Sequence, residues 1–227
     1  MKWPGLFIFQ LAFAALLMFS TGQLLAQNSD QIFAASSITF ERAWEAYTPQ
    51  QVTITVSADG HAKYVSHSAA KPPDEADDYQ TEFTVSTSCR NKLFSNTREA
   101  NYFDGDFTFK KHAVAGTGKK TLAYADSARH FKTAYDYSEN KAIMEITSIF
   151  QGISNTVEYG RKLQFKHRFD KLGLEDELKG MESAAESHNL AQLQLIAPTL
   201  ESILEDASVL NIARQRAKRL LAKASSE

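Results

Sequence analysis

The sequence contains very little cysteine. Cys89 is the single cysteine in 227 residues, and because a disulfide within one chain needs two, no internal disulfide can hold the fold. A chain of this length buries most of the surface that its unfolded form exposes. An apolar core can therefore hold the fold together without a disulfide. Within STSCRNKLFSNTREA, Cys89 shares one helical face with Leu93 and Ala100. We predict that Cys89 is a small core residue; a reactive thiol or an intermolecular disulfide is the alternative.

An excess of positive charge is also missing. The chain has 25 Lys and Arg residues against 27 Asp and Glu residues, a formal net charge of −2. Proteins that bind duplex nucleic acid usually carry a strong basic excess, because neutralising the phosphates drives their affinity. We therefore expect no nucleic-acid partner.

Motifs of the common enzyme classes are absent from the sequence: there is no HExxH, no CxxC pair and no GxSxG. The stretch HAVAGTGKKT contains pieces of a phosphate-binding loop, but Ala113 stands where that loop needs its first glycine, and Lys120 stands where it needs Ser or Thr. Because Leu122 and Tyr124 then alternate as in a strand, we predict that these glycines form the turn of a hairpin.

Metal-binding patterns are missing as well. Asp104 and Asp106 are predicted to lie in a turn, because position 12 of a calcium loop starting at Asp104 is Ala115. His61 and His67 face the same side of one predicted strand but lie six residues apart, too far to share a metal. We predict no catalytic residue, no cofactor and no metal, although a site assembled from distant residues would escape such a search.

The first 26 residues have the order of a secretory signal peptide. Lys2 is followed by the apolar run LFIFQLAFAALLMF and then by STGQLLA. This order predicts cleavage after Ala26 and export to the periplasm or the extracellular space; a retained membrane anchor is the alternative. Removing Lys2 leaves 24 basic and 27 acidic residues, a net charge of −3.

Strand-like alternation dominates the part of the chain that follows. SITFERAW, QQVTITVSADG, HAKYVSH and TEFTVS alternate apolar and polar residues, with Asp59-Gly60 as a tight hairpin turn. The polar stretch SAAKPPDEADD between the last two predicts a solvated loop. A helix capped by Ser86 or Ser88 is expected to run to about Ala100. FTFKKHAV, KKTLAYAD and RHFKTAYDY then predict further strands, the first two joined by AGTG.

From Ser138 the apolar period becomes helical. Five residues recur at spacings of three and four, namely Ile143, Ile146, Phe150, Ile153 and Val157. This narrow stripe predicts one long helix, from about Glu139 to Phe165, packed across the sheet, with Gly152 and Gly160 as weak spots or close-contact points.

Beyond Arg168 the composition favours further helices. Leu174, Leu178, Met181 and Ala185 share one face. A second helix is predicted with Asn189 as its N-cap, kinked or restarted at Pro198, and a third includes Leu210, Ala213, Ala217, Leu220 and Leu221.

The last of these helices is basic. Five basic residues and no acid occur from Ala207 to Ser226, namely Arg214, Arg216, Lys218, Arg219 and Lys223. They form a possible interaction surface for an acidic partner, or for peripheral contact with an anionic membrane. Cations also suit the C-terminal end of a helix without any partner.

Two resemblances to known families follow from these segments. NYFDGDF, KKHAVAGTGKKTLAYAD and YSENKAIMEITSIFQGISNTVEYGRKL, within residues 86–178, resemble an uncharacterised family of exported bacterial proteins with no established activity. The order of elements over residues 35–160 looks like that of emfourin-type inhibitors of secreted metallopeptidases. The glycine-rich turn usual after the first strand of those inhibitors is replaced here by EAYTPQ.

Together these patterns predict an α+β fold: an antiparallel sheet in two runs of strands split by a short helix, packed by one long helix, with a helical C-terminal extension. The expected organisation is a signal peptide at 1–26, an α+β domain at 27–168 and a helical extension at 169–227. The expected function is that of an exported, non-enzymatic binding or protein-interaction module whose partner is an envelope or secreted protein. The alternative is an inhibitor of a secreted peptidase.

Overall fold

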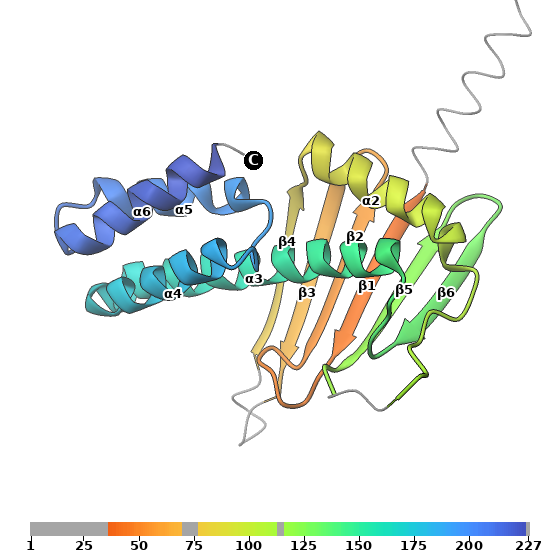
Figure 1. Ribbon diagram of the computed structural model, residues 1–227. Coiled ribbons are helices and arrows are strands. Elements are labelled where there is room, and N and C mark those ends of the chain that lie inside the picture. Colours follow the sequence, from red (N-terminus) through yellow and green to blue (C-terminus); the bar gives the residue numbers. More distant parts are fainter. Residues whose placement is uncertain (1–35, 70–76, 113–115, 226–227) are drawn as a thin grey trace, which may run out of the picture.

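Six strands form one antiparallel sheet in the computed structural model, which describes residues 36–69, 77–112 and 116–225 (Figure 1). The strands are β1 (Ser37–Ala43), β2 (Gln51–Ser57), β3 (His61–Ser68), β4 (Asp77–Thr84), β5 (Lys119–Ala125) and β6 (His130–Tyr135). Their order is β4-β3-β2-β1-β5-β6, so the first run of strands makes one side and β5-β6 extends it beyond β1. The predicted signal peptide and the centre of the predicted solvated loop lie outside the described residues.

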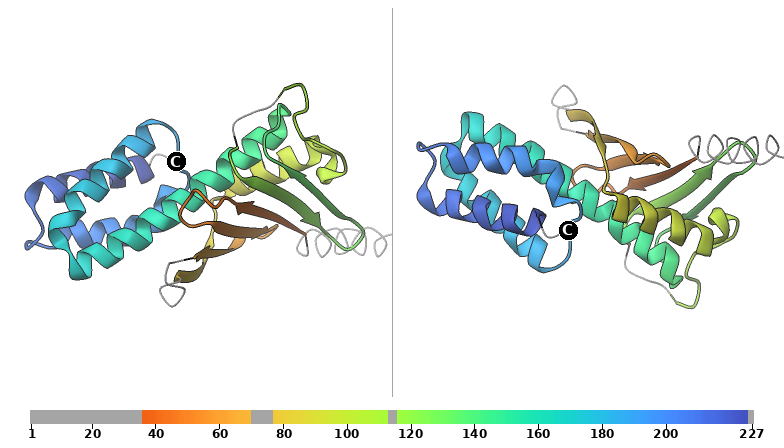
Figure 2. Two further views of the ribbon diagram at one scale, coloured as in Figure 1. Left: turned by 90° about the horizontal axis from the view of Figure 1, so that it is seen from below. Right: turned by 90° about the horizontal axis from the view of Figure 1, so that it is seen from above.

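The helices follow the predicted order. They are α2 (Thr87–Glu99), α3 (Lys141–Phe169), α4 (Leu174–Glu186), α5 (Ala197–Glu205) and α6 (Asn211–Ala224), with short 3-10 turns η2 (Asn101–Phe103), η3 (Lys171–Gly173) and η4 (Leu193–Ile196). Helices α2 and α3 cover one face of the sheet, and α4 to α6 project beyond it with the end of α3 (Figures 1 and 2). The predicted α+β fold with a helical C-terminal region is confirmed.

The core between the sheet and its two helices arises from the alternation in the strands. Phe40, Ile54 and Leu122 are at most 1% exposed and are neighbours in register across β2, β1 and β5. The predicted stripe of α3 packs onto this face: Ile143, Ile146, Phe150 and Ile153 are fully buried and Val157 is 6% exposed. Helix α2 is capped by the Ser86 hydroxyl, which accepts from the Cys89 amide at 3.2 Å, and Cys89 is buried as predicted.

A second hydrophobic cluster forms where α3 runs past the sheet. Its members include Leu163 of α3 and Leu174, Leu200 and Leu220 of the following helices, all fully buried. Because α3 is 29 residues long, its first half belongs to the sheet core and its last turns to this second cluster. The same helix therefore joins the helical extension to the α+β part.

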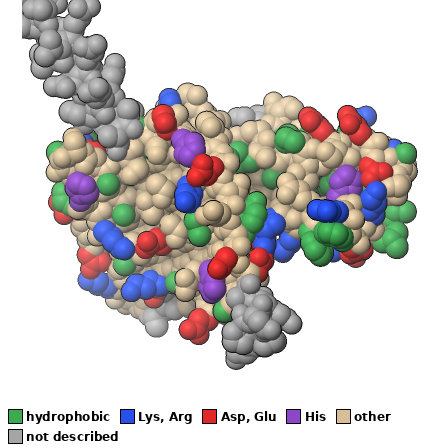
Figure 3. Space-filling model, turned by 180° about the vertical axis from the view of Figure 1, so that it is seen from behind, with side chains coloured by type: hydrophobic (Ala, Val, Ile, Leu, Met, Phe, Trp, Pro, Cys, Tyr) green, Lys and Arg blue, Asp and Glu red, His purple; other side chains and the backbone are tan. Residues whose placement is uncertain are grey.

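Among the helices of residues 36–69, 77–112 and 116–225, none covers the opposite face of the sheet. Its side chains are mostly polar (Figure 3), although Val65 of β3 is also exposed there. Several of the polar side chains are paired: the Thr39 and Thr55 hydroxyls lie 3.0 Å apart, and Lys132 pairs with Glu41 at 3.4 Å. A sheet with one packed and one solvated face is the usual outcome of alternation in antiparallel strands.

The prediction of a strand at residues 107–114 is wrong for its described part. Residues 107–112 contain no strand, and the edges of β5 are occupied by β1 on one side and β6 on the other. No edge is left for a hairpin across AGTG. The segment instead runs beside β6, where the Phe109 amide donates to the Tyr137 carbonyl at 2.9 Å. Ala113 and Val114, the last two residues of the predicted strand, lie outside the described residues.

Gly118 and Lys120, two residues of the stretch that resembles a phosphate-binding loop, have structural roles. Gly118 has a φ of +79°, a conformation that favours glycine. The Lys120 ammonium donates to the carbonyls of Thr117, Gly118 and Asp136 at 2.8 to 3.0 Å and to the Thr117 hydroxyl. This cage of oxygens holds a lysine that is 4% exposed, and burial lowers the pKa of its ammonium.

The prediction that Asn189 caps a helix is also wrong. The chain makes a left-handed turn at Gln192, with φ of +60°, and enters η4 only at Leu193. The Asn189 carbonyl accepts from Asn155 of α3 at 2.9 Å, so this residue joins two elements instead of starting one. Pro198 does restart the helix as predicted, since it lies in the first turn of α5.

We expect Gly152→Ala and Gly180→Ala, both in helices, to change stability in opposite directions. Alanine normally stabilises a helix by about 1 kcal/mol relative to glycine. At Gly152, however, an added Cβ would lie 2.8 Å from Ala191 Cβ and 3.0 Å from its backbone nitrogen, so we expect Gly152→Ala to destabilise by about 1–3 kcal/mol. At Gly180 the nearest atom is 3.5 Å away, so its substitution should stabilise the protein. Urea unfolding measures both; equal effects would contradict close packing at Gly152.

A carboxylate in the β5-β6 turn, that of Asp126, is expected to make the stability of the protein depend on pH. Burial of Asp126 alone would raise its pKa, but hydrogen bonds from the Ala128 and Arg129 amides, the Arg129 side chain and the Tyr124 hydroxyl outweigh it and hold the pKa at about 2. A carboxyl whose pKa is lowered by folding stabilises the protein above its unfolded pKa of about 3.9, and this contribution is lost as the pH falls towards 2. Asp126→Asn should therefore flatten the pH dependence of stability between about pH 4 and pH 2, as measured by thermal unfolding. An unchanged slope would contradict this assignment.

Candidate functional site

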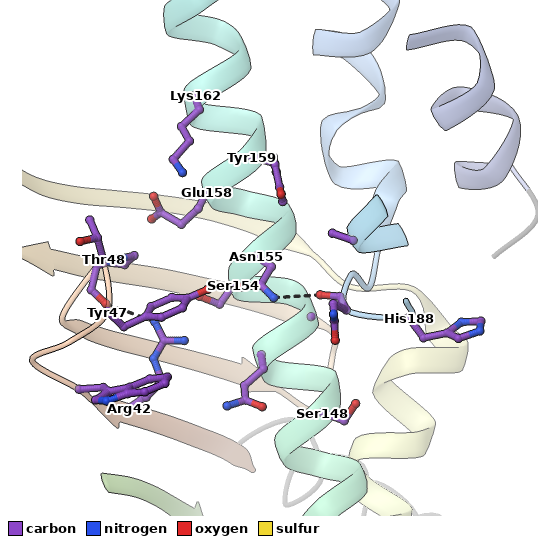
Figure 4. Close-up of a pocket in the computed structure, with 16 residues that line it drawn as sticks. Arg42, Tyr47, Thr48, Ser148, Ser154, Asn155, Glu158, Tyr159, Lys162 and His188 are labelled. Atoms are coloured by element: carbon purple, nitrogen blue, oxygen red, sulfur yellow. Dashed lines mark hydrogen bonds between the residues drawn. The ribbon is translucent and has the colours of Figure 1, made fainter. Parts of the chain in front are cut away.

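A hollow of about 440 Å³ lies where the sheet meets the helical extension. Its floor is the middle of α3, and its walls are the β1-β2 connection on one side and the end of α4 with the chain leading to η4 on the other (Figure 4). This volume lies within the range of small-molecule and peptide side-chain pockets. Both hydrophobic clusters contribute elements to it, so the relative placement of the sheet and the extension sets its shape.

An aromatic wall closes the side formed by the β1-β2 connection. The rings of Trp44 and Tyr47 stack with centroids 5.4 Å apart, and the Arg42 guanidinium carbon lies 4.4 Å from the centroid of the Tyr47 ring. Tyr47 is 37% exposed, and its hydroxyl reaches Asn155 Oδ1 at 3.5 Å. Large aromatic residues held by a cation in this way provide a rigid contact surface.

Arg42 is a buried cation beside this wall. It occupies an inward position of β1, after Ile38 and Phe40, and is 4% exposed. Its Nη2 donates to the Pro49 carbonyl at 3.3 Å, but its Nε has no hydrogen-bond partner among the described residues. Burial lowers the pKa of the guanidinium. A buried donor without a partner is costly and calls for an explanation.

Glu158 presents the opposite charge from α3. One carboxylate oxygen accepts from the Tyr64 hydroxyl at 2.7 Å and from the Ser66 hydroxyl at 3.0 Å, and the other accepts from Arg161 at 3.0 Å. Burial and the nearby carboxylate both raise the pKa of Tyr64. Because both oxygens of Glu158 are already engaged, this carboxylate ties α3 to β3.

The extension completes the hollow through main-chain contacts. The Asn155 amide and the Thr156 hydroxyl of α3 donate to the carbonyls of Asn189 and Ala191 at 2.9 and 2.8 Å. The Ser86 amide in turn donates to Gln192 at 2.6 Å. Lys162 points from α3 towards the hollow, whereas the ring of His188 points away from it (Figure 4). The connection between α4 and η4 is thereby fixed to the α+β part.

The five basic residues predicted as an interaction surface do not lie on one face of α6. At 100° per residue, Arg216, Arg219 and Lys223 fall on one flank of the buried stripe, while Arg214 and Lys218 fall on the other. Arg216 pairs with Glu175 and Glu182 of α4, and Arg219 pairs with Glu182.

These ion pairs change what the basic helix offers to a partner. Arg216 and Arg219 bind α6 to α4; burial alone would raise the pKa of Glu182, but the guanidinium groups of Arg219 and Arg216 outweigh it and lower that pKa. The spacing of seven between Glu175 and Glu182 could have indicated an acidic face on α4 that matches α6. Lys218 is exposed and Arg214 is partly buried, so the cationic surface is smaller than the sequence alone suggests.

The histidines considered for a metal site are instead paired with acids on the open face of the sheet. His61 lies 3.6 Å from Glu82, and His67 contacts Asp78. Across residues 36–69, 77–112 and 116–225, no three His, Cys, Asp or Glu side chains are arranged to hold a metal ion. Asp106 accepts from the Thr108 amide at 2.9 Å, which is the turn predicted there.

Sequence reasoning missed the hollow, although two signals pointed to it. Arg42 stands at a position that alternation directs into the core. Glu158 directly follows Val157, the last of the five apolar residues of α3 that pack on the sheet. A charged residue at an inward position is rarely buried without a partner, so such residues mark places where polar elements meet. What could not be inferred is that the loop after α4 returns to the same point.

No helix in the described part of the chain combines the length and the apolar character needed to cross a membrane. No protein-family model and no curated protein matches the chain. Its function must therefore be argued from the site itself.

Proposed function

We propose that this protein is an exported, non-enzymatic interaction module that holds a segment of a partner protein in the hollow between the β1-β2 connection and the helical extension. The observation that carries the proposal is the stacked pair Trp44 and Tyr47, supported by Arg42 at the edge of an open polar hollow. Aromatic residues held rigidly beside polar groups dominate the binding energy of protein interfaces.

The hydrogen bonds that the ionisable groups of the hollow already form within the protein support binding over catalysis. Both oxygens of Glu158 accept hydrogen bonds from the protein, and the Tyr47 hydroxyl is directed to Asn155. A general acid or base needs a free group that can reach the substrate. The lining offers amide, hydroxyl and aromatic groups instead, which suit recognition of a polypeptide.

The charges of the hollow favour an acidic segment. Arg42 and Lys162 are cations in its lining, whereas the carboxylate of Glu158 is already paired with Arg161. An acidic side chain of the partner would compensate the buried Arg42 cation, which has no anionic partner within hydrogen-bonding distance among the described residues. We therefore expect Asp or Glu in the bound segment.

Selection from a phage-displayed library of random peptides tests this function. Residues 27–227, which retain every described residue, serve as bait, and the enriched peptides are synthesised and titrated by calorimetry. Tyr47→Ala should weaken their binding at least about tenfold, as expected for an interface hot spot. Tyr137→Ala is the matched control, because Tyr137 is 38% exposed and lies outside the hollow. No enriched peptide, or equal loss in both variants, would contradict the proposal.

The peptidase-inhibitor alternative makes a different prediction. It requires a secreted peptidase to be blocked at near-stoichiometric amounts while the chain stays uncut. Such inhibition, if unchanged in Tyr47→Ala, would favour that alternative over binding in the hollow.

A further inference from the structure

The end of α3 and the η3 turn that follows it expose large apolar side chains to solvent. Phe165, Phe169 and Leu172 are 61%, 65% and 75% exposed, and the two phenylalanine rings lie 5.1 Å apart. Phe165 and Phe169 are four residues apart and share one face of α3, opposite the buried Leu163, and Leu172 follows in η3 after α3 has ended at Phe169. We call these three residues the apolar stripe. Contiguous exposed apolar side chains mark interaction sites.

A neighbouring turn enlarges this apolar end of the molecule. Leu210 and Ile212, at the start of α6, are 45% and 53% exposed. The α5-α6 turn is held against the end of α3 by Lys171, which donates to Asp206 at 2.6 Å and to Ser208 at 2.7 Å. Hydrophobic side chains accordingly gather, beside basic ones, at the end of the extension farthest from the sheet (Figure 3).

Two cations flank the apolar stripe. Relative to Phe165, Lys162 and Arg168 lie roughly 60° to either side on the helix. Neither forms an ion pair with a carboxylate in the described part of the chain, whereas Lys166 pairs with Asp170, Lys171 with Asp206 and Arg161 with Glu158 and Asp77. Arg168, whose guanidinium carbon lies 5.0 Å from the centroid of the Phe169 ring, therefore keeps an uncompensated positive charge beside the stripe, while Lys162 extends from the same end of α3 towards the hollow.

We propose that the apolar stripe docks on an anionic membrane surface. Exposed phenylalanine and leucine side chains beside basic residues are typical of segments that lie in the membrane interface. The long basic side chains can keep their charges at the headgroups while their stems cover apolar surface. This surface is distinct from the five basic residues of α6 that the sequence predicts as an interaction surface.

The shape and charge of this end favour lipid over a second copy of the chain. The end of α3 and η3 lies at the tip of an elongated molecule (Figures 1 and 2), where little area is available, and stable protein interfaces bury about 800 Å² on each partner. Two copies meeting there would also bring Lys162 and Arg168 close to the same cations of the other copy. A lipid interface accepts protruding side chains without a matching protein surface.

Vesicle co-sedimentation tests the proposal with residues 27–227, which lack the apolar N-terminal run. Vesicles of phosphatidylcholine mixed with phosphatidylglycerol are compared with vesicles of phosphatidylcholine alone. The triple variant Phe165→Ser, Phe169→Ser and Leu172→Ser should bind the anionic vesicles at least about tenfold more weakly. A control variant replaces three other exposed apolar residues by serine, Val65, Tyr137 and Met144, and should bind as the unaltered chain does.

A charge variant separates the anionic headgroup from the apolar contact. Arg168→Gln should weaken binding to anionic vesicles by about fivefold and leave binding to neutral vesicles unchanged. Circular dichroism verifies that the variants are folded. Absence of vesicle binding by the unaltered chain, or equal binding by the stripe variant, would overturn the proposal. So would a dimer in solution that the stripe variant abolishes while no vesicle is bound.

Discussion

Glu158→Ala is expected to destabilise the protein by about 3–5 kcal/mol, the usual effect of removing one partner of a buried ion pair. The side chain of Glu158 is 10% exposed and that of Arg161 is 24% exposed. Without the carboxylate, the Tyr64 hydroxyl loses its shortest hydrogen bond, at 2.7 Å, and keeps the serine contacts, of which the one to Ser154 spans 3.4 Å. The guanidinium of Arg161 would retain Asp77 but lose its contact within α3. Glu158→Gln keeps the shape and one acceptor, so its effect should be smaller.

Urea unfolding of residues 27–227 measures this effect, and Glu145→Ala is the matched control. Glu145 lies on the same helix and pairs with Lys92, but the two side chains are 41% and 57% exposed. Exposed pairs contribute less than about 1 kcal/mol. Similar losses from both substitutions would show that Glu158 acts as a surface charge and not as the buried link between α3 and β3.

Much of the fold could be predicted from local patterns, namely the alternation of apolar residues in strands and the residue types of tight turns. Val52, Ile54 and Val56 alternate, and all three are buried in β2. Asp59 and Gly60 form the predicted turn, in which the Asp59 carboxylate accepts from the His61 amide at 2.9 Å. These elements depend on local chemistry, so the sequence contains what is needed to find them.

The failed predictions involve contacts that alternation cannot specify. Phe107 and Phe109 alternate like strand residues, but β5 pairs with β1 and β6, so the sheet offered them no partner. Alternation tells which residues share a face, not which strands are neighbours. Asn189 resembled a cap because its residue type is common there, yet its carbonyl is used by Asn155.

The hollow depended on the same kind of distant contact. Tyr47 and Asn155 are 108 residues apart in sequence, and Ser86 meets Gln192 across 106 residues. Nothing local to either partner indicates such a meeting. In contrast, the residues of the apolar stripe, Phe165, Phe169 and Leu172, can be read directly from the sequence, but only the structure shows that no described element covers them.

Phe150→Ala is expected to be comparably destabilising, by about 3–5 kcal/mol, as for other fully buried phenylalanines. The Phe150 ring stacks on Phe40 of β1 with centroids 5.3 Å apart and an interplanar angle of 3°, and both residues are at most 1% exposed. The substitution removes a ring from the centre of the contact between α3 and the sheet. Phe165→Ala is the control on the same helix and should change stability by less than about 0.5 kcal/mol, since Phe165 is 61% exposed.

The same experiment shows whether the two hydrophobic clusters unfold together. Trp44 is the only tryptophan in residues 27–227, so its fluorescence reports on the β1-β2 connection, whereas far-ultraviolet circular dichroism is dominated by the helices of the extension and α3. Because α3 contributes to both clusters, we expect the two signals to shift by the same amount in Phe150→Ala. A shift in fluorescence alone would mean that the extension folds independently, and the hollow between them would then depend on how the two parts dock.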